Sequence, residues 1–282
     1  MNASSSPQAN TFTVALISEV FWEEDGPDRL RARLEQALDL GSQIAVLPEL
    51  PMNPWSPATT EIRPEDAEAP CGPRWSIQAE IAREVGIGLV GGAIIIGDDG
   101  KRRNTALLFS PEGDLLGSWE KAHIPDEPGF READHYARGR DIPTPMSLSG
   151  LSLGLQICSD VNRPEGTHLL AAQGARLILA PRATESATWH RWRPVLIANA
   201  LTSCCWVATV NRPAPEQGVL LGGPSFAVGP DGSVLVETTE TIGTFTFDPS
   251  ELELRRRDYP GYLDIRSDLY EPGWRRLNQR GS

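Results

Sequence analysis

Three residues of reactive type each follow a short apolar run that is predicted to form a β-strand. They are Glu49, Lys121 and Cys158. Taken singly, each has an ordinary structural explanation, as a surface carboxylate, a surface ammonium and a small buried thiol. Taken together, they form a set that could cleave a carbonyl compound by nucleophilic attack.

The chemistry of such a set follows from the three side-chain types. A free thiol has a pKa of about 8.5, and a neighbouring ammonium such as that of Lys121 favours the thiolate. The same ammonium can stabilise an oxyanion that forms on a substrate carbonyl. A carboxylate such as that of Glu49 can accept the proton of Cys158, return it to a leaving amine and then activate water against the thioester.

The elements that must position these residues alternate along the chain. Apolar runs bounded by turn residues predict strands at 11–18, 43–47, 87–96, 105–109, 115–119, 151–157, 177–180, 206–210, 225–228 and 234–236. Helical spacing and stop signals predict helices at 27–40, 74–85, 189–203 and from Pro164 to near Gly174. Strand–helix alternation interleaved with two hairpins predicts an α/β protein with mixed sheets.

A long segment without regular periodicity, 122–145, separates Lys121 from the strand that leads to Cys158. It is charged and is punctuated by Pro125, Pro128 and Gly139. Because long loops inside a compact domain are usually functional, we expect this segment to contribute to the site.

Length and charge limit the classes of protein to consider. The 282 residues contain no linker rich in Ser, Gly or Pro, which predicts one domain at 11–249. Lys and Arg total 26 against 38 Asp and Glu, and the resulting net charge of −12 repels phosphate backbones, so nucleic acid is not an expected partner. The polar segment 1–10 is predicted to be a disordered tail, and 250–282 a charged, aromatic tail that packs on the domain or on a partner subunit.

Cysteine usage and hydropathy indicate a cytoplasmic protein. The four cysteines have no small-domain spacing, which favours reduced thiols, and no run is long and apolar enough to span a membrane. The start of the chain lacks a basic region followed by an apolar one, so no signal peptide is expected. The four histidines are scattered without metal-ligand spacing, and we therefore expect no metal and no cofactor.

Three segments carry a family resemblance. Ile44-Ala45-Val46-Leu47-Pro48-Glu49, Glu120-Lys121-Ala122-His123-Ile124-Pro125-Asp126 and Leu155-Gln156-Ile157-Cys158-Ser159-Asp160 resemble, in order, the motifs of the nitrilase (carbon–nitrogen hydrolase) superfamily. Val210-Asn211-Arg212 and Gly222-Gly223-Pro224-Ser225 resemble further landmarks of that family, so the resemblance covers 11–247.

The resemblance implies a fold and roles for residues. The implied fold is a four-layer αββα sandwich with two mixed β-sheets. Glu49, Lys121 and Cys158 occupy the catalytic positions, and Glu132 matches a second glutamate that supports the lysine and helps to place the substrate. The backbone N–H of Ser159 is the implied second donor to the oxyanion.

The branch of the family is suggested by residues around the motifs. Ser159-Asp160 after the cysteine is more similar to amidases and N-carbamoyl-amine hydrolases than to nitrilases, and His123 to Gly129 resembles N-carbamoylputrescine amidases. Substrate contacts are expected from Ser159, Asn162 and Arg163, and from Arg182, which falls just beyond the predicted strand 177–180. One of these two arginines could bind a substrate carboxylate through two hydrogen bonds, and the alternative, at least as well founded, is an arginine in an intramolecular ion pair.

We therefore expect a metal-independent hydrolase that acts on a non-peptide amide or N-carbamoyl bond of a small molecule through a Cys158 thioester and releases ammonia. A nitrilase that converts a nitrile to an acid and a catalytically silent binding protein of the same fold are the alternatives. By resemblance, we also expect a homodimer or a higher homo-oligomer.

Overall fold

The computed structural model describes residues 11–278. A seven-stranded sheet has the order β13-β1-β2-β4-β5-β6, with β3 paired to β4. Its strands are β1 (Phe12–Ile17), β2 (Ile44–Val46), β3 (Ala67–Glu68), β4 (Gly88–Ile96), β5 (Arg102–Phe109), β6 (Leu115–Glu120) and β13 (Ile242–Phe247). β1, β2 and β4 run parallel, whereas β5 and β6 continue the sheet as antiparallel neighbours.

A second, six-stranded sheet has the order β12-β11-β10-β9-β8-β7. Its strands are β7 (Met146–Leu148), β8 (Leu151–Leu155), β9 (Leu177–Arg182), β10 (Trp206–Asn211), β11 (Ser225–Val228) and β12 (Val234–Thr238). The central strands β8, β9 and β10 are parallel, and the outer strands are antiparallel to their neighbours.

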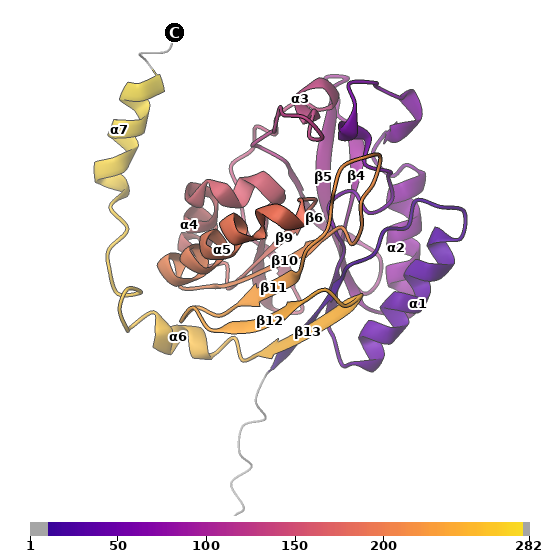
Figure 1. Ribbon diagram of the computed structural model, residues 1–282. Coiled ribbons are helices and arrows are strands. Elements are labelled where there is room, and N and C mark those ends of the chain that lie inside the picture. Colours follow the sequence, from indigo (N-terminus) through magenta and orange to yellow (C-terminus); the bar gives the residue numbers. More distant parts are fainter. Residues whose placement is uncertain (1–10, 279–282) are drawn as a thin grey trace, which may run out of the picture.

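The two sheets pack face to face between two layers of helices (Figure 1). α1 (Gly26–Asp39) and α2 (Pro73–Val85) cover the outer face of the first sheet, and α4 (Pro164–Ala172) and α5 (Trp189–Ser203) cover that of the second. The core between the sheets is apolar and includes Leu16 and Val46 from one sheet and Leu155 and Leu179 from the other. The predicted four-layer αββα architecture is therefore confirmed.

The shared direction of the parallel strands explains why the candidate site lies where their carboxyl ends meet, at one end of the sandwich. β2, β8, β9 and β10 each terminate at this end, and β6 runs in the same direction as β4 because two antiparallel pairings separate them. In open α/β sheets, ligands bind outside the carboxyl ends of such strands. The residues that directly follow these strand ends are therefore gathered together.

The structure corrects several boundaries. The segment 122–145 contains a short helix, α3 (Glu132–His135), and strands β3, β7 and β13 were not predicted. β9 extends to Arg182, so this arginine is the last residue of the strand and not a residue beyond it. Cys158 does not follow its strand directly, because β8 ends at Leu155 and Cys158 begins a 3₁₀ helix, Cys158–Asn162.

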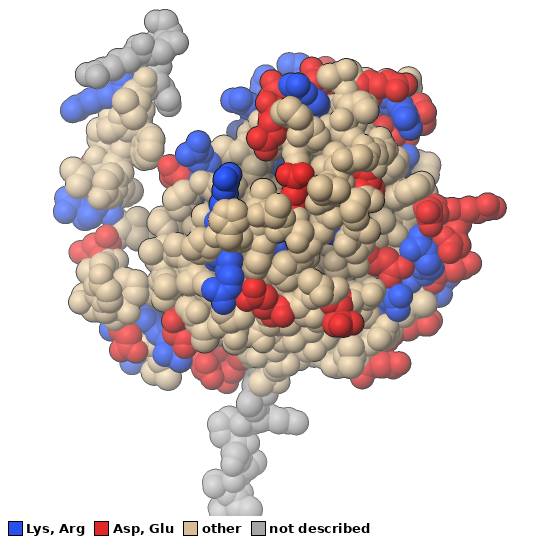
Figure 2. All heavy atoms as spheres, in the orientation of Figure 1, with Lys and Arg blue, Asp and Glu red and all other residues tan. Residues whose placement is uncertain are grey.

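The C-terminal segment leaves the sandwich after β13. α6 (Glu251–Arg255) packs on the domain through the buried Leu252, whereas α7 (Ser267–Asn278) lies outside the sandwich (Figure 1). On the face shown in Figure 2, basic and acidic side chains are interspersed among uncharged residues. None of the helices within residues 11–278 has the length and apolarity that crossing a membrane requires. The predicted disordered tail at 1–10 and the last residues of the C-terminal tail, 279–282, lie outside the described residues.

Candidate active site

Lys121 lies at the centre of a buried cluster of charges. It follows the end of β6, and its ammonium Nζ lies 2.7 Å from Glu49 Oε1 and 2.6 and 2.7 Å from the two carboxylate oxygens of Glu132. All three side chains are fully buried. One cation therefore bridges two carboxylates that come from the loop after β2 and from α3.

A neighbouring amide fixes the orientation of the Glu49 carboxylate. Asn104, on β5, donates its Nδ2 hydrogen bond to Glu49 Oε1 at 2.7 Å, so this oxygen accepts from both Asn104 and Lys121. The other oxygen, Oε2, is buried and has no hydrogen-bond partner within residues 11–278. Glu49 thus retains one free acceptor inside the site.

Cys158 lies in a backbone conformation that is uncommon for a residue with a side chain, with φ at 47°. It is the first residue of its 3₁₀ helix, and its Sγ lies 3.7 Å from the carbonyl oxygen of Ala183, which follows β9. The backbone N–H of Ser159 belongs to the first turn of this helix, where N–H groups have no intrahelical acceptor. A strained backbone held in place by its surroundings is typical of functional sites.

The charge cluster determines the protonation of its members. Burial alone would lower the pKa of Lys121, but Glu132 and Glu49 outweigh it and raise this pKa well above its usual range, so the ammonium stays protonated. Burial, together with repulsion by Glu49, raises the pKa of Glu132 to about 8, although Lys121 opposes this shift.

The thiol of Cys158 is also held in its protonated form. Burial raises its pKa well above the usual range, the carboxylate of Glu49 adds to this, and Lys121 opposes it. A protonated thiol is a weak nucleophile, so attack on a substrate requires a group that accepts its proton at that moment. Glu49, with its free oxygen, is the carboxylate suited to that task.

Asp160 joins the loop of Cys158 to the loop of Lys121. Its Oδ2 accepts hydrogen bonds from Trp119 Nε1 at 2.8 Å and from the backbone of Ile157 at 3.0 Å. Its Oδ1 accepts from the backbone of Ala122 at 3.2 Å and from the backbone and ring Nδ1 of His123, both at 2.9 Å. A single buried carboxylate thereby fixes the relative position of the two loops.

A cavity of about 580 Å³ lies beside the loops that follow Lys121 and Cys158. Three of the four predicted substrate-contacting residues, Ser159, Asn162 and Arg163, line it, together with His123 and Arg138. Arg163 and Arg138 are exposed, and neither forms an ion pair with a carboxylate within the described part of the chain. The cavity therefore presents unpaired positive charge beside the loops that carry Lys121 and Cys158.

Arg182, the fourth predicted contact, does not line this cavity. It is 1% exposed, and its guanidinium donates hydrogen bonds to Thr209 Oγ1 at 3.1 Å, to Thr184 Oγ1 and to the carbonyl of Pro224. It also lies 4.9 Å from the ring of Trp189. Burial lowers the pKa of Arg182 to about 10.

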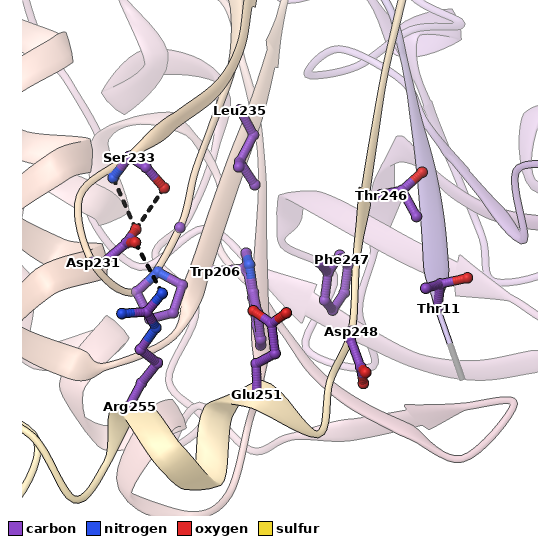
Figure 3. A pocket seen from close by; sticks show the side chains of 12 residues that line it. Thr11, Trp206, Asp231, Ser233, Leu235, Thr246, Phe247, Asp248, Glu251 and Arg255 are labelled. Atoms are coloured by element: carbon purple, nitrogen blue, oxygen red, sulfur yellow. Dashed lines mark hydrogen bonds and ion pairs between the residues drawn. The ribbon is translucent and has the colours of Figure 1, made fainter. Parts of the chain in front are cut away.

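A separate cavity of about 370 Å³ lies at the other edge of the second sheet (Figure 3). It is lined by Trp206, the first residue of β10, and by Asp231, whose carboxylate accepts from Ser233 and forms an ion pair of 3.3 Å with Arg255. Because Cys158 follows the opposite ends of these strands, this cavity is remote from the cluster.

Sequence reasoning missed one residue that contacts the cluster and two that lie near it. Asn104 lies in the middle of a strand, Arg138 in a loop and Tyr136 just after α3, and none has a motif-like neighbourhood. Tyr136 is buried, and its hydroxyl has no hydrogen-bond partner within residues 11–278. β5 is buried at every position from Arg103 to Phe109, so alternation along the strand distinguishes no inward face, and no local signal indicated that Asn104 contacts Glu49.

Comparisons with known proteins agree with this geometry. The family model described as carbon–nitrogen hydrolase matches residues 14–257. The chain is 31% identical to omega-amidase NIT2-A of Xenopus laevis over 264 residues, covering 90% of this chain and 94% of that protein. It is 30% identical to omega-amidase NIT2 of Homo sapiens, covering 88% and 92%.

Solved structures show the same fold. A carbon–nitrogen hydrolase from Helicobacter pylori G27 superposes with a TM-score of 0.84 at 22% identity, covering 93% of this chain and 98% of that one. An amidase from Nesterenkonia sp. AN1 superposes with a TM-score of 0.73 at 26% identity, covering 93% and 99%, and its structure shows the Michael addition of acrylamide at the active-site cysteine. The clustered Glu49, Lys121 and Glu132 beside a buried thiol, the four-layer sandwich and these matches lead to one conclusion: the chain belongs to the carbon–nitrogen hydrolase family of the nitrilase superfamily and is a carbon–nitrogen hydrolase.

Proposed function

We propose that the enzyme hydrolyses the C–N bond of a small amide or N-carbamoyl compound through a covalent intermediate on Cys158 and releases ammonia. One observation carries this proposal: the ammonium of Lys121 bridges Glu49 and Glu132 beside the buried thiol. The omega-amidase relatives favour an amide over a nitrile as the substrate.

In the first half-reaction, Glu49 accepts the proton of the Cys158 thiol as the sulfur attacks the carbonyl carbon. The negative charge that develops on the carbonyl oxygen is stabilised by the Lys121 ammonium and by the backbone N–H of Ser159. Glu49 then transfers its proton to the nitrogen, the C–N bond breaks, and ammonia leaves behind a thioester.

In the second half-reaction, Glu49 accepts a proton from water, whose oxygen attacks the thioester carbonyl. The C–S bond breaks, the sulfur recovers the proton from Glu49, and the product acid departs. Glu132 keeps the Lys121 ammonium in place throughout, because its two oxygens lie 2.6 and 2.7 Å from Nζ.

The proposal is tested with a panel of amides, N-carbamoyl compounds and nitriles, with ammonia release and the acid product as readouts. Cys158→Ala and Cys158→Ser should abolish turnover and the covalent adduct seen by mass spectrometry. Full activity in either variant would refute the mechanism. If only the nitriles yield product, the enzyme is a nitrilase and the proposal of an amidase is wrong.

We further propose that the substrate carries an anionic group, which binds in the cavity lined by Arg138, Arg163 and His123. Two guanidinium groups without a carboxylate partner attract an anion, and an arginine can bind a carboxylate through two parallel hydrogen bonds. Of the two arginines considered from the sequence, the geometry favours Arg163, since Arg182 is occupied by neutral acceptors. The same charge disfavours a polyamine such as N-carbamoylputrescine.

This second proposal is tested with the ω-amide of a short dicarboxylic acid and the neutral alkyl amide of equal length. Arg163→Ala should raise KM for the anionic amide by about 10-fold or more, the loss expected for a hydrogen bond to a charged group, and leave KM for the neutral amide unchanged. Arg131→Ala is the matched control, since Arg131 pairs with Asp126 and does not line the cavity. Equal effects of Arg163→Ala on both amides would exclude an anion site here.

We also propose that two copies of the chain associate through the C-terminal segment. Its large apolar side chains are exposed, with Tyr259, Ile265, Tyr270 and Trp274 each between 55% and 76% accessible. Beside them lies a cavity of about 620 Å³ that this segment forms with α4 and α5. Large contiguous patches of exposed apolar side chains on a monomer usually mark an interface. Sedimentation should show a dimer for the full chain and a monomer after truncation at residue 258, and a monomeric full chain would contradict the proposal.

A further inference from the structure

A fully buried arginine holds the loop that carries Glu49. Arg212 follows the end of β10, and its Nη1 donates hydrogen bonds to the backbone carbonyls of Glu49 and Leu50, both at 2.9 Å. Its Nη2 donates to the carbonyl of Asn53 at 2.9 Å. Glu216 accepts from Nε at 2.8 Å and from Nη2 at 2.7 Å and compensates the charge.

The loop from Pro48 to Pro54 requires such an anchor. Its prolines cannot donate backbone hydrogen bonds, and Leu50 has φ at 51°, a left-handed conformation that is strained for a leucine. The next residue along, Trp55, donates its backbone N–H to Glu216 at 3.2 Å and places its ring 5.7 Å from the Arg212 guanidinium. The Arg212–Glu216 ion pair thus binds three backbone carbonyl groups of the loop.

We propose that Arg212, together with Glu216, is a positioning residue that aims the Glu49 carboxylate at Lys121 and Cys158. This inference rests on the proposed function, in which Glu49 accepts the proton of the thiol. Arg212 follows a strand of the second sheet and Glu49 a strand of the first, so the hydrogen bonds of Arg212 fix the loop of Glu49 relative to the second sheet.

The planar guanidinium cannot be replaced by an ammonium in this role. Arginine presents five N–H groups in a fixed fork, whereas lysine has a compact head that reaches fewer acceptors at once. Displacement of a reacting group by about 1 Å can reduce turnover by about 100-fold. Arg212→Lys should therefore lower kcat by about 10- to 100-fold with little change in KM, because the substrate cavity is not touched.

Arg74 provides a matched control on the same loop. Its Nε donates to the carbonyl of Met52 at 3.2 Å and its Nη2 to that of Glu65 at 2.8 Å, and it pairs with Glu68 at 3.4 Å. It anchors the loop without contacting the backbone of Glu49. Arg74→Lys should lower the temperature of unfolding and leave kcat within about threefold of the wild type, which separates loosening of the loop from misplacement of Glu49.

A second readout does not depend on the substrate. The rate of alkylation of Cys158 by iodoacetamide at neutral pH is measured by peptide mass spectrometry, with the exposed Cys71 as an internal reference. Because the thiol of Cys158 is held protonated, its alkylation requires a group that accepts the thiol proton. The Glu49→Gln variant gives the rate of Cys158 alkylation when that group is absent. Arg212→Lys should lower the Cys158 rate about tenfold toward that of Glu49→Gln, with the Cys71 rate unchanged.

The outcomes are distinct. If Glu49→Gln leaves both turnover and alkylation unchanged, the proposed function has failed at its proton acceptor. The role of Arg212 is refuted if Glu49→Gln lowers kcat and the rate of Cys158 alkylation but the folded Arg212→Lys variant lowers neither. It is refuted as well if Arg74→Lys lowers kcat as much as Arg212→Lys does. If Arg212→Lys does not fold, Glu216→Gln takes its place, because it keeps the side-chain shape, removes the charge and replaces one oxygen that accepts from Arg212 by an NH2 donor. A several-fold lower Cys158 rate supports the inference, and an unchanged rate overturns it.

Discussion

The carboxylate of Asp160, two residues after Cys158, accepts the backbone N–H of His123, two residues after Lys121, at 2.9 Å. The two loops that bear the proposed nucleophile and the proposed oxyanion donor are therefore fastened to each other by one buried side chain. Since Asp160 also accepts from Trp119 and Ile157, it anchors both loops to the strands from which they emerge.

Asp160→Asn should lower both stability and turnover. The carboxylate accepts only N–H groups, and an amide would turn donors of its own toward some of them. Loss of buried hydrogen bonds to a charged group should lower the free energy of unfolding by about 2 to 3 kcal/mol. Chemical denaturation and kcat are the measurements, and a variant that matches the wild type in both would show that the network is dispensable.

Glu132→Gln should flatten the dependence of stability on pH. The pKa of Glu132 is raised from 4.5 to about 8, so between these values the folded state binds a proton that the unfolded state has lost. The free energy of unfolding of the wild type should accordingly fall as pH rises through this window, by up to about 1.4 kcal/mol per pH unit from this group. Denaturation curves at several pH values compare the two proteins, and parallel profiles would contradict the assignment.

Gly139→Ala should impair turnover through Lys121. The backbone N–H of Gly139 donates to the Lys121 carbonyl at 2.9 Å, and an added Cβ would lie 2.8 Å from the Cβ of Glu120. The clash should move the end of β6 and lower kcat by about tenfold or more. Gly273→Ala is the control, because a Cβ there meets no described atom within 4 Å, and its kcat should not change.

Arg182→Lys should reduce stability without weakening the binding of an anionic substrate. The guanidinium links β9 to Thr209 on β10 and to the loop at Pro224. A buried ammonium cannot satisfy these acceptors together, so the free energy of unfolding should fall by about 2 kcal/mol or more. A rise in KM equal to that of Arg163→Ala would instead place Arg182 in contact with the substrate.

Much of the fold could be predicted because hydrophobic periodicity and turn residues are local properties. The predicted strands of both sheets and the helices α1, α2, α4 and α5 are present. β3 and β7 were missed because two or three residues carry no periodicity, and α3 is a single turn. β13 carries a local strand signal in the alternation of Thr and Phe from Thr244 to Phe247, whereas its pairing with β1, more than 200 residues away, cannot be read locally.

Arg182 illustrates why one boundary was misplaced. Pro181 suggests the end of a strand, since proline cannot donate a ladder hydrogen bond. β8, however, pairs with β9 only as far as Leu179, so beyond that point β9 has a neighbour on one side alone. Proline is tolerated there, and the strand continues to Arg182.

The gathering of Glu49, Lys121 and Cys158 could be predicted because each lies in a short contiguous motif. The contacts that support these three residues could not be predicted, because each contact joins residues that are far apart in the sequence. Asn104 reaches Glu49 across 55 residues and Arg212 reaches it across 163. Tertiary pairing of this kind leaves no local pattern in the chain.

The division of the site between the two sheets has a consequence for the biogenesis of the enzyme. Glu49 and Lys121 belong to the half that is synthesised first, whereas the thiol of Cys158 and the guanidinium of Arg212 follow on the other sheet. A nascent chain that has not reached Cys158 therefore holds the proposed base without the proposed nucleophile, and a chain whose two sheets have not docked does not bring the two together. On refolding from denaturant, activity should return only at the rate at which the two sheets dock. The recovery of activity therefore measures completion of the fold.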